Sequence, residues 1–100
     1  MTVERYAVAP GVAWVDADEM GLDRTELYVA RLPAGPPLLL IDAAWAIWLA
    51  MAETGTMAEI VARTAELTES APDDIETAVA DFLDGLVRQG LASVTRTAEE

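Results

Sequence analysis

The segment 38–52 constrains the fold most, because Asp42 is its only charged residue. These fifteen residues are too few for a membrane-spanning helix, which needs about twenty apolar residues. Two consecutive prolines precede the segment, and proline, which lacks a backbone N–H, is found in sheets mainly at strand starts and edges. We therefore expect an edge strand at 38–41, then a buried helix over 43–52 with Asp42 as its N-cap.

The composition excludes several classes of function. One hundred residues correspond to about one domain, so we expect a single domain over 1–100 with a core at about 12–91 and loose tails. The formal charge of −12, with six scattered arginines and no lysine, repels phosphate backbones and predicts no nucleic-acid partner. Cysteine and histidine are absent, which removes disulfides, thiol chemistry and the usual zinc ligands.

The N-terminal half is expected to form three strands. Residues 12–16 and 26–32 are short and β-favouring, and in the second segment Leu27, Val29 and Arg31 alternate with Tyr28 and its neighbours. Residues 17–25 have the composition of a loop, and 33–37 that of a hairpin connection. With the strand at 38–41, these segments predict a three-stranded antiparallel sheet.

Two further helices are expected after the buried one. Thr56 and Glu59 have the spacing of a capping box, and apolar residues recur at helical spacing after them. Pro72 suits the first turn of a third helix, and Gly90 suits its end. Residues 92–95 add at most one short strand, so the predicted fold is α+β, with helices covering one face of the sheet.

Nothing in the sequence indicates a catalytic or metal site. Neighbouring acids such as Asp73 with Asp74, or Asp81 with Asp84, could bind a divalent cation, but a solvated helix face explains them better. No glycine-rich phosphate loop, EF-hand spacing or activated serine is present. We therefore expect no enzyme activity, no metal and no cofactor. The first residues also lack a secretory signal, which predicts a cytoplasmic location and no membrane association.

The predicted edge strand is the segment that we expect to have a function in binding. An unpaired edge exposes a row of backbone donors and acceptors, onto which an extended peptide can add as a further strand. Another segment of this chain, or a second copy of it, could equally cover the edge. Gly85, inside the third helix, costs roughly 1 kcal/mol against alanine and suggests a close approach of another backbone, or packing against a tryptophan.

The chain also resembles PqqD-like proteins, peptide-recognition domains that accompany enzymes modifying ribosomally made peptides. The resemblance lies in LYVARLPAGPPLLLIDAAWAIW, in GTMAEIVARTAELTESAPDDIETAVADFLDGLVRQGL, and in the order of these segments over about 12–91. It implies a winged-helix-like domain of three strands and three helices with no activity of its own. In this family the leader of a precursor peptide docks on the third strand, beside the third helix. Members often have an asparagine where this chain has Asp42.

From the residues and the resemblance together, we expect a non-catalytic module that captures a precursor leader peptide and presents it to a modifying enzyme. Acids such as Asp81 and Asp84 would select basic leader residues. The alternative is a winged-helix regulator or scaffolding protein that acts through protein contacts, as a homodimer paired through the same edge. The expected peptide contacts are Leu38, Leu39, Leu40 and Ile41 on the strand and Ala78, Asp81, Phe82, Gly85, Leu86 and Gln89 on the helix.

Overall fold

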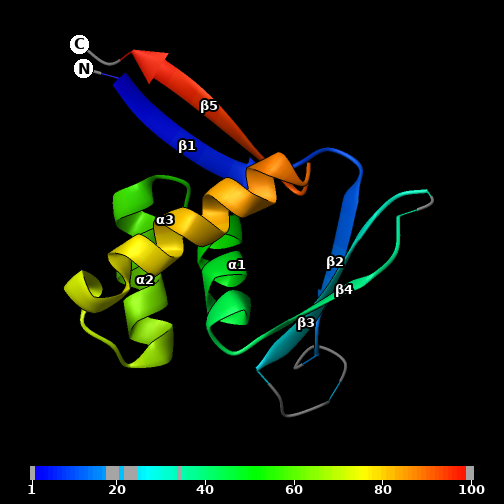
Figure 1. Cartoon of the computed structure of the whole chain (residues 1–100), viewed down its shortest axis with the longest axis horizontal. Helices are drawn as coiled ribbons and strands as arrows, with labels where there is room; N and C mark the ends of the chain where they lie inside the picture. Colours follow the sequence, from blue (N-terminus) through cyan, green and yellow to red (C-terminus); the bar gives the residue numbers. More distant parts are fainter. Residues whose placement is uncertain (1, 18–20, 22–24, 34, 99–100) are drawn as a thin grey trace.

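The protein is an α+β domain in which three helices lie below a two-stranded ribbon and beside a separate three-stranded sheet, both antiparallel (Figure 1). The computed structural model describes residues 2–17, 21, 25–33 and 35–98, so most of the predicted loop at 17–25 lies outside the described residues. The elements, in chain order, are β1 (Thr2–Val8), β2 (Val12–Asp16), β3 (Glu26–Arg31), β4 (Leu38–Ile41), α1 (Ala43–Glu53), α2 (Met57–Thr68), α3 (Pro72–Arg88) and β5 (Ala92–Ala98).

The predicted three-stranded sheet is confirmed. Its order is β2-β3-β4, with both pairs antiparallel and Leu27 opposite Asp16 on one side and Leu40 on the other. Alternation places Leu27, Val29 and Leu40 toward the core, where all three are buried. β4 therefore lies at one edge of this sheet, and β2 lies at the other.

The expectation of loose tails is wrong. β1 and β5 pair over their whole length, from Thr2 opposite Ala98 to Val8 opposite Ala92, and form a second, two-stranded sheet. The ribbon runs past the helices with both termini at its far end (Figure 1). Tyr6 and Val8 pack against the core, so pairing with β5 satisfies the backbone while this face gains apolar burial. The predicted order of three strands and then three helices therefore omits β1 at the start of the chain. It also makes the last strand, β5, too short.

The core is centred on α1, as its apolar composition predicts. Trp48 is fully buried and meets Trp14 of β2 in an edge-to-face contact, with ring centroids 6.1 Å apart. The helix is not buried all round, because Ala43 and Ala52 are exposed. Trp45 is half-buried, and its Nε1 donates a hydrogen bond of 3.1 Å to Asp16.

Asp42 stands at the N-cap position, but its side chain does not cap the helix. Its φ is 52°, a conformation that few residues other than glycine adopt and that asparagine and aspartate tolerate best. The Thr25 hydroxyl donates a hydrogen bond of 3.0 Å to its Oδ1, which ties the start of β3 to the end of β4. The predicted capping role is therefore replaced by a cross-strand hydrogen bond.

The caps predicted for the other two helices are confirmed. Thr56 and Glu59 form both hydrogen bonds of a capping box. The Thr56 hydroxyl, and then its backbone N–H, donate to the Glu59 carboxylate and lower its pKa. At the end of α3, Gly90 has a φ of 77°, and the N–H of Leu91 donates to the Leu86 carbonyl at 2.9 Å. This is a Schellman motif, with Leu91 buried as its apolar contact. Within the described part of the chain, no helix is long and apolar enough to cross a bilayer.

Candidate functional site

The outer edge of β4 carries unpaired backbone groups. Asp42 donates its N–H to the Thr25 carbonyl, and hydrogen-bonded positions in an antiparallel pair recur at every second residue. The backbone N–H and C=O groups of Leu38 and Leu40 therefore point toward β3. Those of Leu39 and Ile41 point away from it. Since β3 is the only strand that pairs with β4 in the described structure, Leu39 and Ile41 present their N–H and C=O groups at a free edge.

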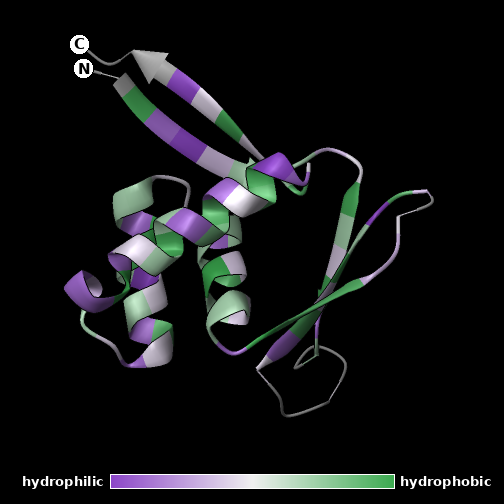
Figure 2. Ribbon diagram, viewed as in Figure 1, coloured by the Kyte–Doolittle hydropathy of each residue, from purple (hydrophilic) through white to green (hydrophobic). Residues whose placement is uncertain are grey.

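The side chains of β4 are unusually exposed for their type. Leu38, Leu39 and Ile41 have 39%, 51% and 50% of their surface exposed, whereas Leu40 is buried at 9%. β4 is a continuous hydrophobic band in Figure 2. An apolar edge strand of this kind is a site for strand pairing or aggregation unless another chain covers it.

Four of the expected contacts on α3 form a flank of the helix, and one of them, Gln89, lines a cavity together with Leu38 of β4. Ala78, Phe82, Gly85 and Gln89 are spaced by four, three and four residues, so they share one face of the helix. Ala78 and Gln89 are exposed, and Phe82 and Gly85 are half-buried. Leu86 is only 2% exposed, so it supports this flank from the core and offers little surface to a ligand.

The two acids expected to select basic leader residues take different positions on α3. Asp84 forms an ion pair of 3.0 Å with Arg88, one turn along the helix. The pKa of the Tyr6 hydroxyl is raised by burial first, then by Glu4, and also by the charge of Asp84, which places Asp84 toward β1. Asp81 is exposed and lies about 40° around the helix from Gly85, at the margin of the flank. Asp84 therefore lies about 160° around the helix from Phe82.

A cavity of about 310 Å³ joins the start of β4 to the end of α3. It brings together Leu38 and Gln89, two of the expected contacts from opposite halves of the chain. The sequence reasoning missed its other lining residues, which are Arg31, Gly35, Pro36 and Leu91. A signal for Arg31 was present, because alternation in β3 places it on the same inward face as Leu27 and Val29.

The geometry of this cavity depends on two glycines. A methyl group at Gly35 would lie 2.6 Å from the Arg31 carbonyl oxygen, closer than any carbon can approach, so only glycine lets the hairpin turn this tightly. A methyl group at Gly90 would lie 3.3 Å from Nη1 of Arg31. The Arg31 guanidinium therefore extends from β3 to the C-terminal end of α3 and forms one wall of the cavity.

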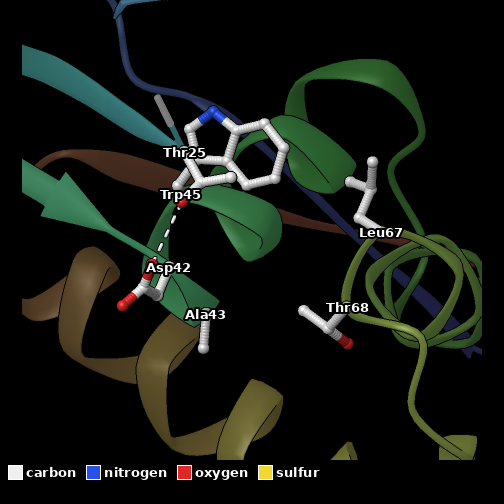
Figure 3. Close-up of a pocket in the computed structure, with 6 residues that line it drawn as sticks. All are labelled: Thr25, Asp42, Ala43, Trp45, Leu67 and Thr68. Carbon is white, nitrogen blue, oxygen red and sulfur yellow. Dashed lines mark hydrogen bonds between the residues drawn. The ribbon is translucent and has the colours of Figure 1, made fainter. Parts of the chain in front are cut away.

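A second cavity, of about 350 Å³, lies at the other end of β4. Thr25, Asp42, Ala43 and Trp45 line one side, and Leu67 and Thr68 of α2 line the other (Figure 3). The Thr25–Asp42 hydrogen bond lies at its rim, and the Trp45 ring forms an apolar wall. The free edge of β4 thus runs from one cavity to the other, a length of about 13 Å for four residues.

The space beside Gly85 is open. An added Cβ there would meet no atom within 4 Å, so no backbone or tryptophan of the described chain explains this glycine, and the expectation of packing against a tryptophan is wrong. We expect Gly85→Ala to stabilise the free protein by about 0.5–1 kcal/mol, because alanine has the higher helix propensity and nothing obstructs it. Urea unfolding followed by circular dichroism measures the change. Destabilisation would instead show that the flank is tightly packed.

No group of three or more metal-ligating side chains exists among the described residues. In the comparison with protein families, the family model described as "Coenzyme PQQ synthesis protein D (PqqD)" matches residues 38–92 of this chain. Neither the curated proteins nor the solved structures contain a significant match. The matched segment includes β4, all three helices and the flank of α3 described above.

Proposed function

The chain belongs to the PqqD family, and on that basis we propose that it is a non-catalytic module that binds the leader of a ribosomally made precursor peptide and presents it to a modifying enzyme. The family implies a binding partner for a precursor peptide in biosynthesis. The observation that carries the finer proposal is the free edge of β4, whose outward N–H and C=O groups belong to Leu39 and Ile41. A leader strand would pair there and extend the sheet to four strands.

Affinity and selectivity would come from different parts of this site. Backbone hydrogen bonds to β4 form with any extended sequence, so they supply binding without much discrimination. Side chains of the leader would alternate between the outer face, beside Leu39 and Ile41, and the inner face, against Phe82 and the space at Gly85. The exposed apolar surface on β4 favours a leader with apolar residues at alternate positions.

The direct test uses a short peptide encoded beside the gene of this protein. Titration of the labelled peptide should give saturable binding by anisotropy, with a dissociation constant below about 100 μM. Hydrogen exchange should then show new protection at the amides of Leu39 and Ile41, with no change at Leu38 and Leu40, which already pair with β3. Saturable binding without protection of these two amides would refute strand addition at β4.

A homodimer paired through an edge strand is the second candidate. Leu32, Leu39 and Ile41 are all at least half exposed, and the edge of β2 offers a further pairing site in the same sheet. A dimer that uses β4 would compete with the leader for the same backbone groups. Sedimentation with and without peptide separates the two, because a leader would dissociate that dimer, whereas a regulator or scaffold would remain dimeric.

A further inference from the structure

The cavity between β4 and α3 contains an arginine without an ion-pair partner. Among the described arginines, Arg63, Arg88 and Arg96 form ion pairs with neighbouring acids, and the charge of Arg5 acts on Glu59. Arg31 forms no ion pair or side-chain hydrogen bond within the part of the chain that the structure describes. In a chain with a net charge of −12, a cation left without an acid at the end of a groove calls for a functional explanation.

The surroundings of Arg31 suit a carboxylate. Gln89 lines the same cavity, and its side-chain amide can donate a second hydrogen bond beside the guanidinium. Pro36, Leu38 and Leu91 provide an apolar wall against which methylene groups can pack. Guanidinium and carboxylate form paired, charge-assisted hydrogen bonds that are stronger than those between neutral groups.

We propose that Arg31, with Gln89, binds an aspartate or glutamate side chain of the leader. This inference rests on the proposed strand addition, and it replaces the expected selection of basic leader residues at this end of the groove. A leader residue on the inner face beside Leu38 points into the cavity. Because same-face residues of a strand are two apart, the next inner residue lies beside the apolar side chain of Leu40. The recognised pattern is therefore one acid two positions from one apolar residue.

The net charge of the protein makes this selection depend on position. Acids elsewhere on the peptide meet a field that repels them, including that of Asp81 on α3. Only the position opposite Arg31 favours a negative charge. Asp and Glu should therefore be enriched at that single position of bound peptides and depleted at the others.

The experiment selects a displayed library of random twelve-residue peptides on the immobilised full-length protein. Parallel selections use Arg31→Gln and, as the matched control, Arg88→Gln, which removes the same charge from an exposed residue paired with Asp84. Each enriched peptide is also tested against Leu39→Pro, so that only peptides bound at the β4 edge are counted. We expect the acid preference in the wild type and in Arg88→Gln, and its loss in Arg31→Gln.

A double-mutant cycle then separates recognition from a structural role of Arg31 at the end of α3. For one enriched peptide, the Glu→Gln or Asp→Asn change should weaken binding to the wild type by about tenfold and to Arg31→Gln by less than twofold. Arg31→Lys keeps the charge without the two-pronged geometry and should give an intermediate ratio. Equal ratios in the wild type and in Arg31→Gln would overturn the inference.

The remaining outcomes are also decisive. Peptides that require the β4 edge but show no positional acid preference would overturn the role of Arg31 and leave strand addition intact. If no enriched peptide depends on Leu39, the proposed function fails, and the inference fails with it. Thermal melts of each variant confirm that binding is compared between folded proteins.

Discussion

Leu39→Pro is expected to leave the protein folded and to weaken peptide binding by about 30-fold or more. Leu39 directs its N–H to the free edge, so proline removes no hydrogen bond to β3. It does remove one donor to the leader, and its ring occupies the space that the leader carbonyl needs. A lost hydrogen bond that leaves its partner unsatisfied costs about 1–3 kcal/mol, and the steric clash adds to this.

The matched control is Leu39→Ala, which keeps the N–H and removes only the outward side chain. We expect it to bind within about fivefold of the wild type, because only part of one apolar contact is lost. Anisotropy titrations measure both variants, and circular dichroism confirms their fold. Equal binding by Leu39→Pro and the wild type would refute pairing at this edge. Equally weak binding by the two variants would mean that the side chain, and not the backbone, provides the affinity.

Local patterns predicted most of the fold because the elements concerned are specified by nearby residues. Alternation identified β2 and β3, the prolines before Leu38 identified an edge strand, and the capping box at Thr56 marked the start of α2. The β1–β5 ribbon was missed because its strands come from opposite ends of the chain. Pairing of that kind depends on the finished tertiary structure and leaves little trace in either segment alone.

The candidate site was predictable to a similar extent. The edge of β4 and the flank with Phe82 and Gln89 follow from strand and helix periodicity together with the family resemblance. The helical repeat could also have placed Asp84 away from that flank, since it lies about 160° around α3 from Phe82. The cavity at Arg31 could not be predicted, because it depends on the tight turn at Gly35 and on the position of the helix end.

Removing the largest core side chain should have the largest effect on stability. Trp48 is fully buried and joins α1 to β2 through its contact with Trp14. We expect Trp48→Ala to lower the free energy of unfolding by about 3–5 kcal/mol, because it removes the indole and leaves a cavity. A domain of this size has a total stability of about 5–15 kcal/mol, so the variant would lose a large share of it. Urea unfolding followed by far-ultraviolet circular dichroism measures the change.

Trp48→Phe keeps an aromatic ring in the core and, like Trp48→Ala, removes the indole N–H. The Trp48 Nε1 is buried and has no hydrogen-bond partner among the residues that the structure describes. An unsatisfied buried donor costs about 1–3 kcal/mol, so phenylalanine loses volume but is relieved of this cost. We expect Trp48→Phe to lose less than half as much stability as Trp48→Ala. Equal losses would show that the phenyl ring does not refill the space of the indole between α1 and β2.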